Sequence, residues 1–513
     1  MKSCLKRIRI YLILLCSVLP ASRLCASSLL DLYMGVDLIG QLSLKGTYLS
    51  INPKPPFYML PELSLEDRVR LVESLKPRQY SRPEPPQPDR VNGAEDQSLE
   101  QAAIKVNDVE RKQQNSRLLI RGMKVLSGET MTDDYTVIVE NGVISQVVAT
   151  AAVNKQEGDE EHDYHAVGGI VLPGFIDLLL HGAAGVDVME GKAAVLTIAN
   201  RLVEEGTTAF LAGTMTQSPE LTLAAIKGVQ AAMKQQASAG IEGSEILGVH
   251  AEGPFFSPHK MGCHLPSCQR VPDLLEVETW QQEADGIVRV ITLAPELPEA
   301  EEFIAVCKSA DIILSIGHTS CDGNEAFDYI GRGIGLATHL FNAMPDGGHS
   351  PGTAGCAMGI LRTGIPYTLI ADKHHLDSSI IYGLTEWRSF TQRAILISDG
   401  ISAKYVGEGE FELGGQEIVV EGDKAKLKGK SNLAGSLLKM NEAVRNIIEF
   451  SAGQLTLAEA ALLASRNPAK VLKLDHVKGL IKANMHADLV ILDENYDVLA
   501  TYRFGQKVFP SGG

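Results

Sequence analysis

Aromatic residues are scarce in this chain: they make up 5% of its 513 positions, and only two of them are Trp. Glycine is plentiful by comparison, with 48 occurrences. Many small residues and few aromatic ones favour close helix–strand packing, which is more typical of an α/β protein than of an aromatic-rich binding module. The length also exceeds what one ordinary hydrophobic core takes, so we expect more than one domain.

An excess of basic residues is missing as well. Lys and Arg number 47 against 63 Asp and Glu, which gives a formal net charge of −16 with His neutral. Domains that bind nucleic acids usually carry a basic excess. We therefore expect no nucleic-acid partner.

The apolar run near the start, Ile10–Ala21, is too short to cross a membrane. It has twelve residues, whereas a span needs about 20, so we expect no stable membrane span. Basic residues precede this run and small residues follow it up to Ala26, which is the arrangement of a secretory signal. We interpret residues 1–26 as a signal-like leader and predict a cytoplasmic protein, with export through this leader as the alternative.

Cysteines are few, and the five of eight that follow this leader are an odd number. A disulfide framework shows an even, patterned set. The Cys263-x4-Cys268 spacing also lacks the second pair that a zinc site of this kind needs. We expect buried or inert thiols at all five positions, which are Cys263, Cys268, Cys307, Cys321 and Cys356.

The two ends of the chain differ from its middle. Residues 27–115 include a Pro-rich polar stretch, Lys76–Arg90, and we interpret them as an N-terminal extension that is partly disordered. Residues 116–170 and 470–513 show short β-rich segments broken by turn signals such as Asn141-Gly142. We predict that these two segments form one small β-sandwich domain.

Eight apolar, β-rich runs alternate with helical segments in residues 171–469. This alternation predicts a (β/α)8 barrel, a fold of typically about 250 residues, and a doubly wound open sheet is the alternative. No G-x-x-x-x-G-K-[ST] phosphate loop occurs here, and no G-x-G-x-x-G opens a helix. Their absence weakens the open nucleotide-binding sheet.

Polar side chains follow several of these runs at the point where the strand ends. In a barrel those ends meet at one mouth, so we expect the side chains to converge. Two imidazoles and one carboxylate suit Zn²⁺ or Fe²⁺ and leave a position open for water. Glu252, His318 and His339 are our predicted metal site. The full set is His181, Glu252, His318, His339, His375 and Asp399.

At these same positions the chain carries a series of short motifs in a fixed order. Through them it resembles the N-acetylglucosamine-6-phosphate deacetylases of the amidohydrolase superfamily, over roughly Ser116 to Phe509. The resemblance implies hydrolysis of the acetamide of N-acetylglucosamine 6-phosphate to glucosamine 6-phosphate and acetate, and a homodimer. The motifs are Pro173–Asp177, His250–Phe255, Lys260–Pro266, Thr292–Glu296, Gly317–Thr319, Thr338–Pro345, Ile370–Asp377, Ile397–Gly400 and Leu433–Ser436.

The resemblance also implies roles for individual residues. Glu252, His318 and His339 would hold one divalent metal ion, with zinc expected and iron, manganese or cobalt as alternatives. Asp399 would be the catalytic acid and base, and His264 would polarise the acetyl carbonyl. The implied substrate contacts are Cys263, His264, Asn342, Ala343, His349, His375, Leu433 and Ala434, of which Asn342 and Ala343 meet the phosphate.

From residue type alone, two of these roles have ordinary alternatives. His264 lies in a loop with Gly262 and Pro266, where an exposed histidine with no function is common. Asn342 is as well suited to capping the next helix as to binding a ligand.

The chain departs from the family pattern at two positions. Leu179 stands where many amidohydrolases have the first residue of His-x-His, so we expect one metal ion with His181 as a neighbour. His349 stands where relatives commonly have Arg, and His lacks the bidentate fork and the permanent charge. Phosphate binding is then weaker, or Lys373 or His374 supplies it.

Two other functions therefore stay open. One is deacetylation of an unphosphorylated or different N-acyl amino sugar, which His349 and the leader favour. The other is a catalytically inactive barrel that serves as a binding or scaffold subunit. A scaffold has no need for Glu252, His318, His339 and Asp399 together, which argues against the second.

Overall fold

The computed structural model describes residues 65–77, 117–345, 354–387 and 389–510. The signal-like leader, most of the predicted N-terminal extension and His349 lie outside the described residues.

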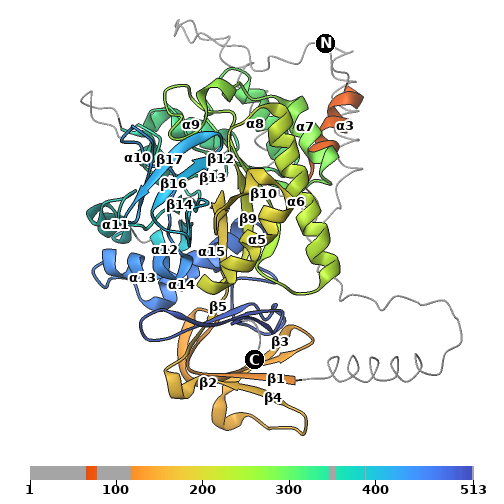
Figure 1. The fold of residues 1–513 in the computed structure, drawn as a ribbon, viewed down its shortest axis with the longest axis vertical. Coiled ribbons are helices and arrows are strands. Elements are labelled where there is room, and N and C mark those ends of the chain that lie inside the picture. The colour runs from red at the N-terminus through yellow and green to blue at the C-terminus, as the bar shows by residue number, and fades with distance from the viewer. Residues whose placement is uncertain (1–64, 78–116, 346–353, 388, 511–513) are drawn as a thin grey trace, which may run out of the picture. The chain divides into compact units, whose positions relative to one another are not determined.

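The central element is a barrel of parallel strands, as predicted. Eight of them are found among the described residues, and neighbours in the chain are neighbours in the sheet (Figure 1). Hydrogen bonds close the barrel where the chain leaves its last strand, with the Asp399 N–H donating to the Leu179 carbonyl at 3.0 Å. The alternative open sheet is thus excluded. The strands are β6 (Phe175–Leu180), β9 (Thr207–Thr214), β10 (Glu245–Glu252), β11 (Val288–Leu293), β12 (Ile313–Ile316), β13 (Leu336–Ala337), β14 (Tyr367–Leu369) and β15 (Ala394–Leu396).

Helices between and after these strands cover the barrel, and local sequence sets where several of them begin. The Ser218 hydroxyl accepts from the Leu221 N–H ahead of α6, and Asp322 and Glu325 form a capping box for α9. The helices are α5 (Lys192–Leu202), α6 (Pro219–Ala239), α7 (Leu274–Glu283), α8 (Ala300–Ser309), α9 (Gly323–Arg332), α10 (Cys356–Leu361), α11 (Ser378–Thr385), α12 (Phe390–Arg393), α13 (Met440–Phe450), α14 (Leu457–Ala464) and α15 (Arg466–Val471).

Both ends of the catalytic region contribute strands to a second sheet, which is drawn in orange and dark blue in Figure 1. Ile120 and Val137 from one end share a buried apolar core with Ile491 and Tyr502 from the other. The two ends thus build one common β unit, in which the described strands belong to a single hydrogen-bonded sheet. Its strands are β1 (Arg117–Ser127), β2 (Thr130–Glu140), β3 (Val143–Ala149), β4 (Glu160–Asp163), β5 (Ile170–Pro173), β19 (Leu489–Leu492), β20 (Val498–Arg503) and β21 (Gln506–Phe509).

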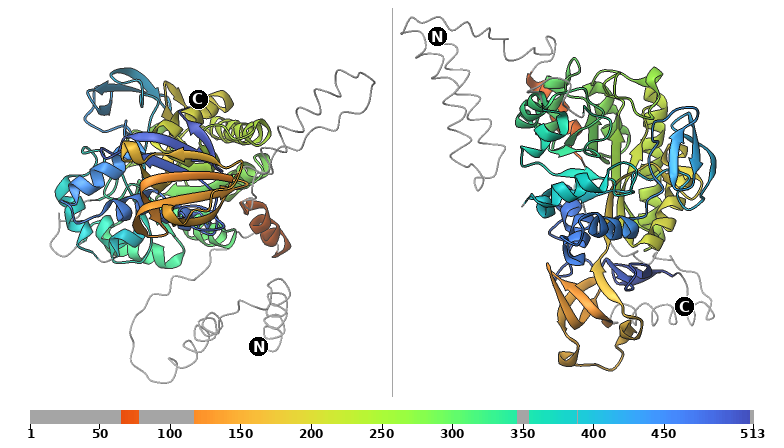
Figure 2. Two further views of the ribbon diagram at one scale, coloured as in Figure 1. Left: turned by 90° about the horizontal axis from the view of Figure 1, so that it is seen from below. Right: turned by 90° about the vertical axis from the view of Figure 1, so that its left-hand side faces the viewer.

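Two further small sheets follow barrel strands, and the sequence patterns did not indicate them. One is the antiparallel pair β7 (Gly182–Ala183) and β8 (Val186–Asp187). The other joins β16 (Gly409–Leu413), β17 (Gln416–Glu421) and β18 (Lys424–Leu427) by antiparallel pairing. Figure 2 shows the sheet β16–β18, in light blue, beside the barrel.

Part of the predicted extension is helical and belongs to the barrel core. Helix α3 (Leu65–Leu75) packs against α7 and α8, and its Leu71 and Leu75 are buried. The Gln281 side-chain amide donates to the Leu75 carbonyl at 2.9 Å. Across the described segments, none of the helices combines the length and apolarity that a membrane crossing requires.

Replacing Leu75, whose exposed fraction is 0%, with Ala tests this packing. We expect the free energy of unfolding to fall by about 2–5 kcal/mol, because a buried Leu→Ala change removes apolar contacts and leaves a cavity. Val69→Ala is the control on the same helix, where the side chain is 55% exposed and a surface change is worth about 0.5 kcal/mol. Denaturant unfolding measures both, and equal small effects would show that α3 does not pack as described.

Candidate active site

A cavity of about 380 Å³ lies where the barrel strands end. Its lining brings together residues that are far apart in the chain, including the three predicted metal ligands and Asp399. The described residues that line it are His181, Glu252, His259, Lys260, Gly262, Cys263, His264, His318, His339, Asn342, Ala343, Ile370, His375, Asp399, Asn432, Leu433 and Gly435.

The predicted metal ligands converge on one point. Glu252 Oε1 lies 3.0 Å from His339 Nε2 and 3.5 Å from His318 Nε2, and the two Nε2 atoms are 3.1 Å apart. Two ligands bound at 2.0–2.1 Å to a tetrahedral ion are separated by about 3.3 Å. The observed separations therefore match the edges of such a site.

The tautomer of His318 also fits metal binding. Its Nδ1 lies 2.8 Å from the Lys260 carbonyl oxygen, which can only accept, so Nδ1 carries the proton and Nε2 presents a lone pair. Metal-binding histidines commonly donate their other N–H to such an oxygen. The donor set thus fits a divalent ion.

An unusual backbone conformation orients three of the side chains that line the cavity. His318, His339 and Asp399 each follow a strand by two or three residues and have φ angles of 48°, 32° and 50°. Few non-glycine residues adopt this left-handed region, and each such residue costs of order 1–3 kcal/mol. Strain of this kind concentrates at functional sites, which supports a role for all three.

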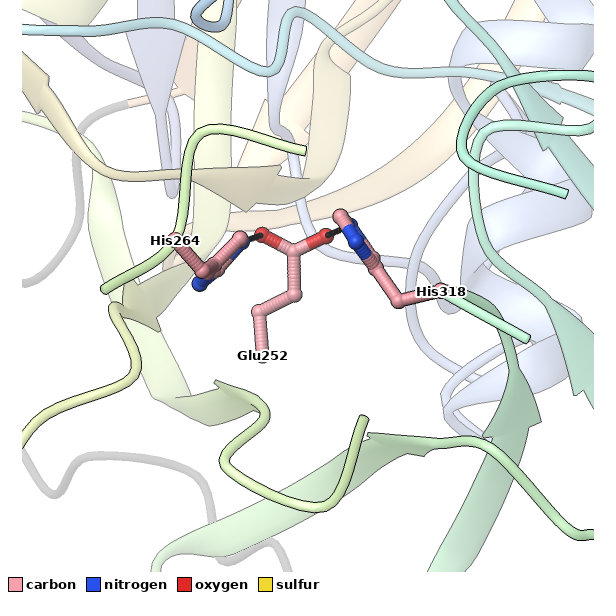
Figure 3. A group of neighbouring side chains, drawn as sticks. All are labelled: Glu252, His264 and His318. Atoms are coloured by element: carbon pink, nitrogen blue, oxygen red, sulfur yellow. Dashed lines mark ion pairs between the residues drawn. The ribbon is translucent and has the colours of Figure 1, made fainter. Parts of the chain in front are cut away.

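The second oxygen of Glu252 faces two further histidines. Glu252 Oε2 lies 2.9 Å from His181 Nε2 and 3.2 Å from His264 Nε2. Figure 3 shows Glu252 between His264 and His318, with one carboxylate oxygen directed to each ring. Burial alone would raise the pKa of Glu252, but the hydrogen bonds to its histidine neighbours hold it well below the usual value. Glu252 is therefore ionised and central to the cluster.

His181 connects this carboxylate to Asp399. Its Nε2 lies 3.4 Å from Asp399 Oδ1, and its Nδ1 donates to the Gly213 carbonyl at 3.2 Å. Burial disfavours the charged ring, yet hydrogen bonds to Asp399 and Glu252 raise the pKa of His181 well above its usual value. His181, Glu252 and Asp399 also form a second group with metal-ligand spacing, next to a Leu179 side chain that offers no ligand atom.

His264 is buried, with an exposed fraction of 2%, so the alternative of an exposed loop histidine is excluded. The Thr216 N–H donates to its Nδ1 at 3.2 Å, which places the ring proton on Nε2. Burial lowers the pKa of His264 to about 4. The ring is thus a neutral N–H donor at the cavity, and in this structure its Nε2–H faces Glu252 Oε2 at 3.2 Å.

The residue before Asp399, Ser398, is held by Asp177 of the first barrel strand, β6. The Ser398 hydroxyl and N–H both donate to the Asp177 carboxylate, at 2.5 and 3.2 Å. Burial opposes ionisation of Asp399, but its hydrogen bond to His181 keeps its pKa below the usual value. A base at this position is therefore ionised and fixed in direction.

The predicted substrate contacts do not all lie at the cavity. Cys263, His264, Asn342, Ala343, His375 and Leu433 line it. Ala434 packs instead in the apolar core under β16–β18, and His349 lies outside the described residues. Asn342 caps no helix that the structure describes, because α10 has Gly355 as its N-cap.

Lys373 and His374, which we suggested as substitutes for a phosphate-binding Arg, do not line the cavity. Lys373 Nζ lies 3.3 Å from a Glu449 carboxylate oxygen, and His374 Nε2 lies 2.9 Å from Asp423 Oδ1. Lys260, to which sequence reasoning gave no role, lines the cavity, and its Nζ donates to the Met344 carbonyl at 3.2 Å. The signal in the sequence was its place in the motif Lys260–Pro266. Residue type alone does not show which groups a loop Lys faces.

Comparisons with known proteins match most of the chain to one family. The model of the "Amidohydrolase family" matches residues 170–509. N-acetylglucosamine-6-phosphate deacetylase of Bacillus subtilis is 35% identical over 77% of this chain and 98% of its own length, and the Homo sapiens enzyme of that name is 33% identical over 69% and 87%. A Mycobacterium smegmatis deacetylase variant, solved in complex with N-acetyl-D-glucosamine-6-phosphate, aligns with a TM-score of 0.69 at 27% identity, over 77% of this chain and 100% of that one.

Metal analysis tests the ligand set. Replacing His318 or His339 with Ala removes one of three donors, so we expect each purified variant to lose the divalent ion and all measurable turnover. His374→Ala is the matched control, since that imidazole pairs with Asp423 away from the cavity. Full metal content in either the His318 or the His339 variant would refute the assignment.

Proposed function

The chain belongs to the amidohydrolase family, and on that premise we propose that it deacetylates N-acetylglucosamine 6-phosphate to glucosamine 6-phosphate and acetate. The observation that carries the proposal is the convergence of Glu252, His318, His339 and Asp399 in one cavity. Such a set supplies what amide hydrolysis needs: an activated water, a polarised carbonyl and a proton for the leaving amine.

A metal ion contributes the first two requirements. Members of the amidohydrolase superfamily bind a divalent metal. We propose zinc, held by Glu252, His318 and His339, because a borderline set of two imidazoles and a carboxylate suits it. Bound there, the ion lowers the pKa of water and polarises the carbonyl.

Asp399 moves the proton. As the water oxygen bonds to the acetyl carbon, the Asp399 carboxylate accepts a proton from the water. It then returns this proton to the nitrogen as the C–N bond breaks, which gives acetic acid and the amine. The remaining acid proton passes to the amine, so the products are acetate and the ammonium form of the amino sugar. Its ionised state, shown by the lowered pKa, suits the first step.

His264 stabilises the charge that develops on the carbonyl oxygen. Its ring is neutral and its Nε2–H lies at the cavity wall beside Glu252 Oε2, so it serves as a hydrogen-bond donor and not as a base. A fixed donor at this place is worth about 10²–10³ in turnover.

We propose that Lys260 binds the phosphate, together with Asn342 and Ala343. Lys260 is the only Lys or Arg among the described residues that line the cavity, and it reaches the segment next to Ala343 through its bond to Met344. A phosphate ester near neutral pH carries almost two negative charges and needs such a partner. This cation favours a phosphorylated substrate over the unphosphorylated alternative.

A phosphorylated substrate also favours the cytoplasm, where sugar phosphates normally occur, over export through the leader. The homodimer stays a proposal that rests on the family resemblance alone.

A deacetylation assay with phosphorylated and free N-acetylglucosamine tests the substrate. We expect the wild type to prefer the phosphorylated sugar. Lys260→Met should raise the KM for the phosphorylated sugar by about 10- to 100-fold, since a hydrogen bond to a charged group contributes about 1.5–3 kcal/mol. Turnover of the free sugar should not change. Lys373→Met is the control, and a wild type that prefers the free sugar would contradict the assignment.

Asp399→Asn tests the proton transfer. Asn is nearly isosteric with Asp but accepts no proton from water, so we expect turnover to fall by at least about 10²–10⁴-fold. Metal content and thermal unfolding should match the wild type. Asp423→Asn makes the same chemical change on the surface and should leave turnover intact. An Asp399 variant within a few-fold of the wild type would assign the proton transfer to another group.

A further inference from the structure

The small sheet β16–β18 contacts several loops that follow barrel strands, two of which line the cavity. The Gly414 carbonyl accepts a hydrogen bond from the Gln217 amide at 2.9 Å, just after β9. On the other side, the Ala434 N–H donates to the Ala425 carbonyl at 3.1 Å. Apolar side chains of the sheet share a core with Ile401, which follows Asp399. The sheet thus forms a fixed support behind the cavity.

Gln416 makes the third contact, with the loop that carries His264. Its side-chain amide donates to the Cys263 carbonyl at 2.8 Å and to the His264 carbonyl at 2.9 Å. Both protons of one NH₂ group are used, so two consecutive carbonyls are held by a single side chain. Such a contact fixes the orientation of this peptide segment as well as its distance from the sheet.

The register of the hairpin places Gln416 for this contact. Leu413 pairs with Gln416, which leaves the two-residue turn Gly414–Gly415 between the strands. Both glycines have positive φ angles, 53° and 82°, as the tight turn of a two-residue hairpin requires. Gln416 is therefore the first residue of β17. A shift of the strand register by one residue would turn its side chain to the other face of the sheet.

We propose that Gln416 is a positioning residue for His264 in the deacetylation reaction. It does not line the cavity and touches no reacting atom, so its effect passes through the loop. The ring of His264 is held by the Thr216 N–H, by Glu252 Oε2 and by edge-to-face contact with Phe256. Its backbone is held separately, from Met261 and from Gln416. The proposal rests on the role of His264 as a donor to the carbonyl oxygen.

A small displacement of His264 is enough to matter. Stabilisation of an oxyanion depends on a donor at about 2.7–3.1 Å from the developing charge, and a misplacement of about 1 Å can cost 10²-fold in rate. Because the charge forms only in the transition state, the loss appears in kcat and not in KM.

Gln416→Met tests the proposal, because Met has a similar length but donates no hydrogen bond. We expect kcat for the phosphorylated sugar to fall by about 10- to 100-fold while KM changes by less than about threefold. Gln416→Glu, which places acceptors against two carbonyls, should lose at least as much. Metal content and the unfolding midpoint should stay at wild-type values in Gln416→Met.

Glu417→Ala is the matched control on the same strand. Its side chain is exposed on the opposite face, so kcat should not change. An equal loss of kcat in this control would assign the effect to the sheet as a whole and overturn the role of Gln416.

A double-mutant cycle with His264→Ala separates positioning from general support. If Gln416 acts through His264, then Gln416→Met has no further effect once His264 is Ala. Additive losses would overturn the proposal, and so would unfolding or loss of metal in Gln416→Met. Full activity in His264→Ala would instead refute the role of His264 itself, on which the proposal rests. If His264→Ala is inactive and Gln416→Met is fully active, only the positioning role of Gln416 is refuted.

Discussion

The site depends on the contacts between the buried Glu252 carboxylate and the four imidazoles around it. Each of its oxygens faces two imidazoles, and the rings lie 2.9–3.5 Å away. A buried carboxylate costs several kcal/mol to desolvate unless charge and hydrogen bonds surround it. The strand β10 places Glu252 at its last residue, so the barrel supplies both the rigid base and the converging neighbours that this carboxylate needs.

The barrel, and the convergence of the candidate metal ligands at its mouth, were predictable because their signals are local. Strands β9 and β10 are buried at every position, which produces the continuous apolar runs seen in the sequence. A polar residue just past such a run stands out, as Glu252 and His318 do. Topology then determines that they meet, since parallel strands of a barrel end at one mouth.

Other parts of the molecule lacked such a signal. Strand β16 has mostly exposed residues and two glutamates, so its pattern is that of a loop. Helix α3 lies beside a Pro-rich stretch and packs on residues about 200 positions away, a contact that periodicity does not reveal. The side chains of Lys260 and Gln416 contact main-chain carbonyls, which every residue has, so residue type gave no indication of their partners.

Charge balance explains why one divalent ion suits this cavity. Glu252 and Asp399 are the two carboxylates among the described lining residues, and the surrounding histidines are neutral when they bind a metal. We propose that one ion of charge +2 offsets these two negative charges and that His181, whose pKa is raised in the metal-free site, is then neutral. A second ion would need further anionic ligands. Leu179 lies where such a ligand would help to hold a second ion and contributes none. In the proposed substrate complex the phosphate is left to a separate cation, Lys260, which lines the cavity and is not among the proposed metal ligands.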